Sequence, residues 1–327
     1  MRLVALAALA LLCASCAGGG GGGTTAPAVA ADDRYVVGVS STRLGDAWHE
    51  QLICSVKAEA LASGKVAEVL VDDVVAGPER QAAGIRNLVT SGADAIVLVA
   101  SDPTALDAAI AEATGAGAVV VAVDRPVTSE DAYVVMTDQI AYGRLGMEWL
   151  SHSLGGAGQV LVLREEGDDA RRQGIALGLA SLTVVEQQAA GMERLAELDV
   201  AFDAVWAPGP DYAIVDALAE LGRSEVPVVG TDNNEFLRQL RDGAEGAAVT
   251  DPAAVGGVGT AIALDVLEGL DPPRQTLLTP EVWTWPEDRE AIERYYDPSA
   301  PPAFSALATV EPFTHYTPDQ VRACQAP

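Results

Sequence analysis

Polar side chains that could bind a hydroxylated molecule recur directly after apolar runs of the sequence. They are carboxylates, guanidinium groups and one indole, namely Asp46, Trp48, Asp124, Arg125, Asp138, Arg171 and Asp232. Carboxylates accept and arginines donate hydrogen bonds to hydroxyls, while an aromatic face packs on the apolar C–H side of a sugar ring. Taken singly, each acidic residue could instead cap a helix and complement its dipole. Their recurrence after several runs favours binding of a small neutral polyol.

Motifs of enzymes and metal sites are missing from the sequence. It contains neither a G-x-S-x-G nucleophile motif nor a P-loop motif. The three histidines, His49, His152 and His315, are far apart, and no pair has metal-ligand spacing. Adjacent carboxylates such as Glu165 and Glu166 point apart in most backbones, so they favour a solvated surface over an acid–base pair. We therefore expect no catalytic residue, metal or cofactor.

Buried strands and helices alternate along the chain and would position these side chains. Tyr35–Ser40, Ala95–Val99 and Ala118–Val123 are continuous runs rich in Val, Ile or Ala, separated by helical patterns. Such runs predict parallel strands covered on both faces and joined by right-handed crossovers. The pattern restarts at Tyr133. We expect an α/β protein with two doubly wound parallel-sheet lobes joined by a hinge, which would bind ligands at the carboxyl ends of the strands.

The beginning of the sequence predicts export. Met1-Arg2 precedes an apolar run from Leu3 to Leu12, which is too short to span a bilayer. The small residues that end on Cys16 are similar to a bacterial lipoprotein signal, in which that cysteine carries the lipid. The alternative is a plain secretory signal cut near Ala17. Either signal places the mature protein outside the cytoplasm, at the cell surface or in the periplasm, and the first attaches it to the membrane by lipid alone.

The net charge excludes some classes of binding partner, and the cysteines permit a disulfide. Lys and Arg total 20 against 47 Asp and Glu, a formal net charge of −27. Such a negative field argues against nucleic acid and anionic membrane surfaces as partners. Cys54 and Cys324 remain beside the expected anchor, and an oxidising compartment permits a disulfide between them. The alternative is two unpaired thiols.

The pattern predicts the following division of the chain. Residues 1–15 form a lipoprotein signal, 16–33 a flexible tether, 34–130 plus 251–283 the N-terminal lobe, 131–250 plus 284–300 the C-terminal lobe, and 301–327 a tail.

Six segments in order resemble one family, the type I periplasmic sugar-binding proteins, which are substrate receptors of carbohydrate ABC importers. They are Tyr35–Ser40 with the aromatic loop 44–48, Val121–Arg125 with its Asp-Arg pair, Tyr133–Gly146, Ala170–Gly174, Val228–Asp232 and Ala247–Pro252. The resemblance implies a non-enzymatic receptor that binds a small sugar and delivers it to an ABC permease by hinge closure. Lactose-repressor-like regulators share this core, but a signal and a glycine run stand where they carry a DNA-binding motif.

The sequence departs from that family in the second lobe. The region 175–198 is short and offers no second stacking aromatic, and Pro208-Gly209-Pro210 replaces a common Asn-Asp pair. Trp206 and Asp211 are then the nearest candidates for ligand contact. Two alternatives stay open, namely a receptor for another small solute such as a nucleoside or a signalling furanose, and a sensor component that docks on a membrane kinase.

Overall fold

The computed structural model describes residues 34–41, 46–73, 77–164, 167–188, 195 and 200–327. The expected signal, the tether and Cys16 lie outside these ranges. Within them, no helix has both the length and the apolar character that crossing a membrane requires. The described ranges also contain no cluster of His, Cys, Asp and Glu side chains suited to a metal ion.

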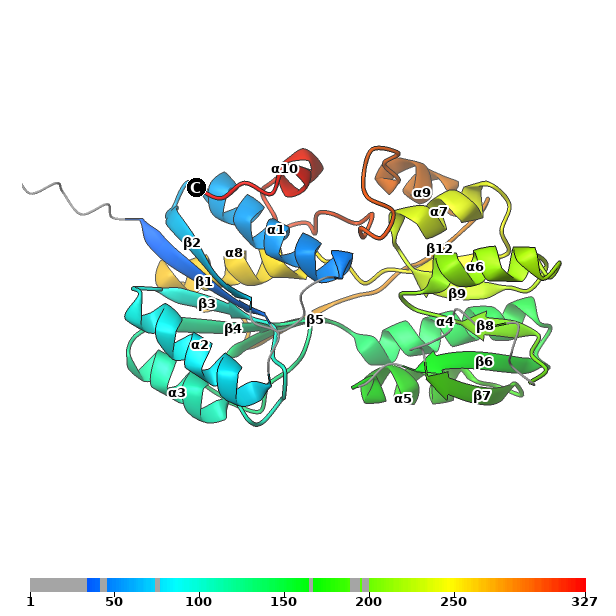
Figure 1. Cartoon of the computed structure of the whole chain (residues 1–327), viewed down its shortest axis with the longest axis horizontal. Coiled ribbons are helices and arrows are strands. Elements are labelled where there is room, and N and C mark those ends of the chain that lie inside the picture. The colour runs from blue at the N-terminus through cyan, green and yellow to red at the C-terminus, as the bar shows by residue number, and fades with distance from the viewer. Residues whose placement is uncertain (1–33, 42–45, 74–76, 165–166, 189–194, 196–199) are drawn as a thin grey trace, which may run out of the picture. The chain divides into compact units, whose positions relative to one another are not determined.

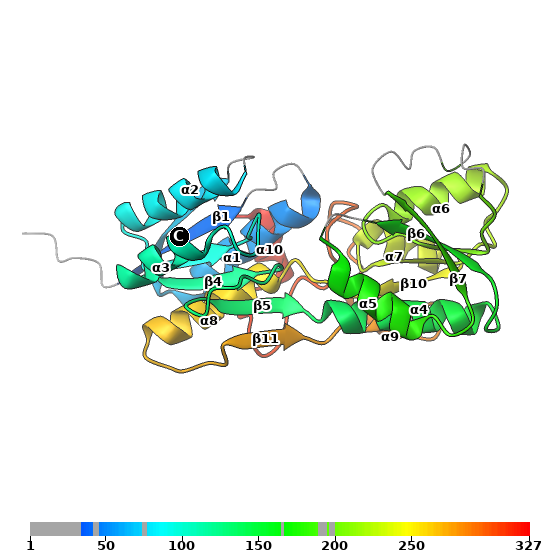
Figure 2. The ribbon, with the colours of Figure 1, turned by 90° about the horizontal axis from the view of Figure 1, so that it is seen from below.

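The first sheet contains six parallel strands in the order β11-β5-β4-β3-β1-β2 (Figures 1 and 2). Their bounds are Tyr35–Ser41 (β1), Val66–Asp73 (β2), Ala95–Leu98 (β3), Val119–Val123 (β4), Tyr133–Thr137 (β5) and Gln275–Leu278 (β11). Helices α1 (Ala47–Ser63) and α8 (Val255–Leu267) pack on one face. Helices α2 (Pro78–Thr90) and α3 (Asp107–Gly115) cover the other. Burial on both faces explains why these strands are continuously apolar.

The second sheet has the order β12-β10-β9-β8-β6-β7, and only β12 runs antiparallel to its neighbour in the described pairing. Its strands are Gln159–Arg164 (β6), Thr183–Gln188 (β7), Ala204–Trp206 (β8), Val228–Thr231 (β9), Gly246–Val249 (β10) and Val282–Thr284 (β12). Helices α4 (Gln139–Ser153) and α5 (Asp169–Gly178) cover one face. Helices α6 (Asp211–Glu220), α7 (Asn234–Arg241) and α9 (Arg289–Tyr295) cover the other.

The predicted fold class is confirmed, but two strands lie in the other sheet from the one that the predicted lobe boundaries gave them. Tyr133–Thr137 pairs with β4 and β11 in the first sheet, although the boundary at residue 131 assigned it to the second lobe. Val282 and Trp283 pair with β10 in the second sheet, although the first lobe was expected to extend to residue 283. The chain therefore completes β5 in the first sheet before it crosses to the second. It crosses to the second sheet again after β11 and before β12 begins.

Polar side chains begin the helices that face the strand ends. The Asp46 carboxylate accepts a hydrogen bond from His49 N at the start of α1, and Asp138 accepts one from Ala141 N at the start of α4. Asn233 does the same for Phe236 N in α7. These caps satisfy backbone donors that a helix leaves unpaired. Asp46 and Asp138 therefore cap helices, which was the alternative role considered for the acidic residues.

The tail returns from the second sheet to the first. Beyond α9 it passes Asn233, with which Ser305 forms a β-bridge, and it ends in the short helix α10 (Pro318–Ala323) on α1 (Figure 1). The predicted disulfide is present and joins Cys54 of α1 to Cys324. The tail therefore contacts elements of both sheets.

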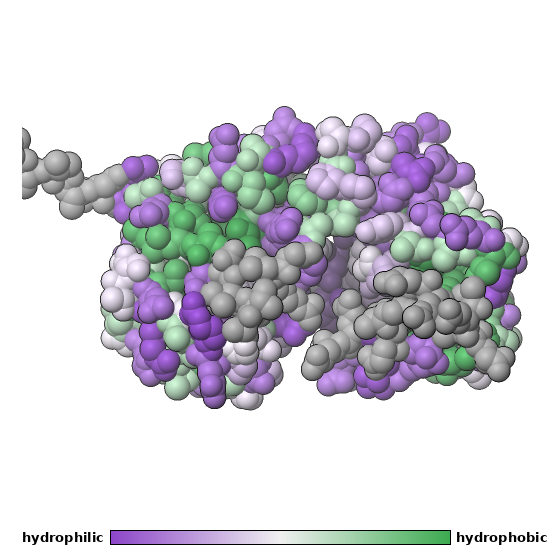
Figure 3. All heavy atoms as spheres, viewed as in Figure 1, coloured by the Kyte–Doolittle hydropathy of each residue, from purple (hydrophilic) through white to green (hydrophobic). Residues whose placement is uncertain are grey.

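The face shown in Figure 3 carries many hydrophilic residues. An apolar area lies over the β2 edge of the first sheet, where Leu61 and Val71 are exposed.

Candidate functional site

Asp251, just after β10, joins side chains that come from both sheets. Its carbonyl oxygen accepts a hydrogen bond of 2.9 Å from Trp48 Nε1, at the start of α1. Its carboxylate Oδ2 lies 3.1 Å from Arg171 Nη2 of α5 and accepts a bond of 3.2 Å from Gln139 Nε2 of α4. Its backbone N–H donates to Asp232 Oδ1 at 2.9 Å. Three predicted site residues thus meet at a residue that was not predicted.

Arg171 is held in one orientation by several contacts. Its Nε donates to Gln139 Oε1 at 2.8 Å, and its guanidinium lies 4.5 Å from the centre of the Tyr142 ring. The Arg171–Asp251 ion pair is mostly buried, with side-chain exposures of 15 and 12 %. A guanidinium fixed in this way presents donors in a set geometry, which suits recognition of hydroxyl oxygens.

Asp124 and Arg125 lie at the end of β4, as predicted. Asp124 has a φ of 66°, a left-handed conformation that is uncommon outside glycine. Burial and then the Asp251 carboxylate raise the pKa of Asp124 to about 6, against the lowering effect of His49, Arg125 and Arg171. Arg125 Nε lies 3.9 Å from Asp124 Oδ2. These mutual electrostatic effects place Asp124 in the same charged group as Asp251 and Arg171.

His49 is a site candidate that was not among the predicted ligand residues. The residue is 4 % exposed, and its Nδ1 lies 2.7 Å from Asp46 Oδ2. Among the described residues, Nε2 is buried and has no hydrogen-bond partner. An unpaired buried polar atom is costly, which makes Nε2 a candidate for contact with a ligand. The Asp46-x-x-His49 spacing was the available signal, because residues three apart share one helix face.

Asp232 is completely buried and already accepts three hydrogen bonds. Asp251 N donates to Oδ1, and Ser305 Oγ and Leu307 N donate to Oδ2 at 2.6 and 3.2 Å. Burial raises the pKa of Asp232, while these donors lower it. A carboxylate has about four acceptor positions, so these three donors occupy Oδ2 fully and leave one position on Oδ1.

Trp206, which was predicted to contact ligand, packs in the core of the second sheet. It is 1 % exposed, meets the Tyr142 ring edge-on at a centroid distance of 5.8 Å and packs against Gly146 of α4. Side chains alternate between the faces of a strand, and Trp206 is on the face that α4 covers. Asp211 is likewise buried, and its carboxylate accepts bonds from Thr231, Asn233 and its own neighbour Tyr212.

The cluster is chemically suited to a neutral ligand rich in hydroxyls. It combines carboxylate acceptors, a fixed guanidinium, an amide and a half-buried indole, contributed by α1, β4, α4, α5 and the ends of β9 and β10. Asp138 directly precedes Gln139 of this group in the sequence, but the Asp138 carboxylate caps α4.

Comparisons with known proteins agree with this architecture. A family model for the periplasmic binding protein domain matches residues 37–271. The ribose import binding protein RbsB of Bacillus subtilis is 25 % identical over 260 residues, which cover 72 % of this chain and 82 % of that protein. A xylitol-binding protein of Mycolicibacterium smegmatis is 29 % identical over 175 residues, 47 % of this chain and half of its own length.

A solved structure of an ABC transporter solute-binding protein from Mycobacterium smegmatis, with bound glycerol, has the same fold. It superposes with a TM-score of 0.73 at 23 % identity and covers 83 % of this chain and 99 % of its own. Because the family model covers well over half of the sequence and both sheets match the fold, this chain belongs to the periplasmic binding protein domain family, whose members are receptors and not enzymes.

Proposed function

We propose that this protein is an exported receptor that binds a small neutral sugar or polyol and delivers it to an ABC permease. The observation that carries the proposal is the group around Asp251, where Trp48 of the first lobe and Arg171 of the second contact the same residue. Ribose, xylitol and glycerol, the ligands named for the similar proteins, are all small and polyhydroxylated. This shared chemistry supports a neutral ligand of that class.

In the proposed site, Trp48 packs on the apolar side of the ligand, while Asp124, Arg125, Arg171 and Asp232 bind its hydroxyls. His49 Nε2 and the Asp251 carboxylate provide further polar contacts. Binding draws the two lobes together because each contributes groups that the other lacks, and the closed form is the one presented to the permease. No bond of the ligand is made or broken.

The proposal is tested by measuring which sugars and polyols raise the melting temperature and then determining the dissociation constant by calorimetry. We expect Asp124→Ala, Asp232→Ala and Trp48→Ala each to weaken binding at least about tenfold, or ~1.4 kcal/mol. Asp131→Ala is the matched control, since Asp131 is an exposed carboxylate of the first lobe. If a ligand is found and all three substitutions leave its dissociation constant within about twofold, the site lies elsewhere.

We also propose that Cys16 carries a lipid that attaches the protein to the membrane. The short apolar run ending in Ala14-Ser15 before this cysteine supports the proposal. The following glycine run would then separate the folded part from the membrane surface.

A further inference from the structure

The tail makes direct contact with the proposed sugar site through Ser305. Its hydroxyl donates to Asp232 Oδ2 at 2.6 Å, and Leu307 N donates to the same oxygen at 3.2 Å. Ser305 is 4 % exposed and Asp232 is fully buried. Two of the three donors to this carboxylate therefore come from a segment about 70 residues further along the chain.

Gln51 of α1 holds Ser305 from the side of the first sheet. Gln51 Nε2 donates to Ser305 O at 2.9 Å, and Ser305 N donates to Gln51 Oε1 at 2.7 Å. This reciprocal pair is buried, since Gln51 is 2 % exposed. Ser305 thus connects an amide on a helix of the first sheet to a carboxylate at the end of β9 in the second.

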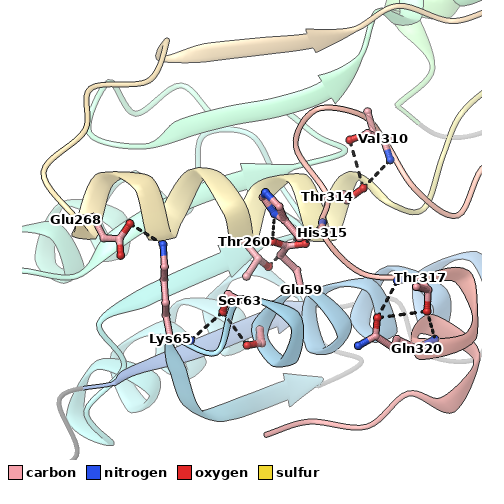
Figure 4. Close-up of polar contacts among 12 residues, drawn as sticks. Glu59, Ser63, Lys65, Thr260, Glu268, Val310, Thr314, His315, Thr317 and Gln320 are labelled. Carbon is pink, nitrogen blue, oxygen red and sulfur yellow. Dashed lines mark hydrogen bonds and ion pairs between the residues drawn. The ribbon is translucent and has the colours of Figure 1, made fainter.

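The tail is anchored on both sides of Ser305. Before it, Asn234 and Asp297 exchange two hydrogen bonds, of 2.6 and 2.9 Å, and Asn234 N donates to Phe304 O. After it, His315 contacts the buried Glu59 of α1 through its backbone N–H and its ring (Figure 4). The Cys54–Cys324 disulfide follows. With both flanks fixed, the position of Ser305 is determined by the fold rather than by Asp232.

We propose that Ser305 is a positioning residue for ligand binding, which fixes the Asp232 carboxylate in the orientation that accepts a ligand hydroxyl, with Gln51 fixing Ser305 in turn. A carboxylate held by short donors loses little further freedom when the ligand arrives, and this lowers the free-energy cost of binding. Without the Ser305 hydroxyl, Oδ2 keeps only the longer bond from Leu307. Held only by Leu307 N and by Asp251 N on Oδ1, the carboxylate gains freedom that ligand binding has to remove.

The role of Ser305 rests on the proposed function, so the test begins with a sugar or polyol that the wild-type protein binds. Ser305→Ala should weaken binding of that ligand about tenfold. Ser305→Thr, which keeps the hydroxyl, should restore most of the affinity. Ser299→Ala is the matched control, because this hydroxyl of the same tail donates to Asp297 and lies on the exposed surface. Melting temperatures of all variants separate loss of affinity from loss of folding.

If Ser305→Ala does not fold, Ser305→Cys replaces it, since a thiol fills the same space but is a weak donor. Equal affinities of Ser305→Ala, or of this replacement, and Ser299→Ala would overturn the positioning role while leaving the receptor function intact. Failure of Ser305→Thr to recover affinity would also overturn it, provided that variant melts like the wild type. A wild-type protein that binds no sugar or polyol would remove the proposed function itself, and the role of Ser305 with it.

Discussion

Asp124 is an acidic residue at a strand end whose charge changes close to neutral pH. Burial and the Asp251 carboxylate raise its pKa to about 6, from an ordinary value of 3.8. Its left-handed backbone, with φ at 66°, marks a position where the fold holds a conformation that is unfavourable for a side chain. Above pH 6 such an aspartate only accepts hydrogen bonds, whereas below pH 6 it is protonated, and one of its oxygens donates instead.

Ligand affinity should therefore fall as the pH falls from 7.5 to 5. With a pKa of about 6, roughly nine-tenths of Asp124 is protonated at pH 5, so affinity should drop about tenfold if only the carboxylate binds. The effect of pH on the stability of the folded protein has the opposite sign. Because the folded pKa is raised, the contribution of Asp124 to stability is complete below pH 3.8 and is lost as the pH rises through 6.

Calorimetry across this pH range, with Asp124→Asn beside the wild type, tests the assignment. The amide cannot ionise, so binding by this variant should be weak and nearly independent of pH. Asp131→Asn, at an exposed carboxylate, should keep the wild-type profile. A wild-type affinity that is constant from pH 5 to 7.5 would contradict the role of Asp124.

The location of a site residue could be predicted from the sequence only where it follows from the strand that precedes the residue. Asp124, Arg171 and Asp232 follow strands, and the direction of a parallel strand already determines the edge of the sheet at which they lie. The side chain of Trp206 turns to the α4 face, and the short strand β8 gives no pattern from which this orientation could be predicted. Asp251 was missed because its importance comes from contacts with four distant segments.

At the scale of elements, glycines bring α4 and α5 into backbone contact. A Cβ at Gly143 would lie 2.0 Å from Arg171 O, and one at Gly174 would lie 2.0 Å from Ile140 O. This close approach places the Arg171 guanidinium over the Tyr142 ring, within reach of Asp251. The packing of two helices thus determines where a site residue lies.

Gly143→Ala should consequently lower both stability and ligand affinity. The added methyl must separate the helices, and overpacking of this kind costs about 1–3 kcal/mol. The same separation moves Arg171 away from Asp251. Thermal unfolding and calorimetry measure the two effects, and Gly115→Ala in α3 is the control because nothing lies within 4 Å of its added Cβ. Equal melting temperatures for the two variants would show that the helices can separate freely.

The order of strands and helices was largely predictable, whereas the sheet to which each crossing strand belongs was not. Periodicity identifies Tyr133–Thr137 and Val282–Thr284 as strands. Their sheets depend on which neighbour each strand pairs with, and this is a long-range choice. Val134 pairs with Gln275, and Trp283 pairs with Ala248. A local pattern contains no information about such partners.

At the scale of the whole molecule, the proposed anchor at Cys16 determines where the receptor works. Cys16→Ser should release the protein from the membrane fraction, because the thiol that accepts the lipid is lost. Cell fractionation and the intact mass of the purified protein measure this, and Thr24→Ser in the expected tether is the control that leaves both the signal and the lipid acceptor in place. A wild-type protein that is wholly soluble, with Ala17 or a later residue at its amino terminus, would contradict the anchor.

The Cys54–Cys324 bond also has a consequence for the order of events during biogenesis. The two cysteines are 270 positions apart, so in the proposed export Cys54 would cross the membrane long before its partner and would wait as a thiol. The sequence contains four cysteines; of the other two, Cys13 lies in the proposed signal and Cys16 is the proposed lipid acceptor directly after it. Removal of the first and lipidation of the second would leave Cys324 as the sole partner for Cys54 within the chain. Oxidation then has a single intramolecular product, and maturation requires an oxidant but no shuffling of mispaired bonds.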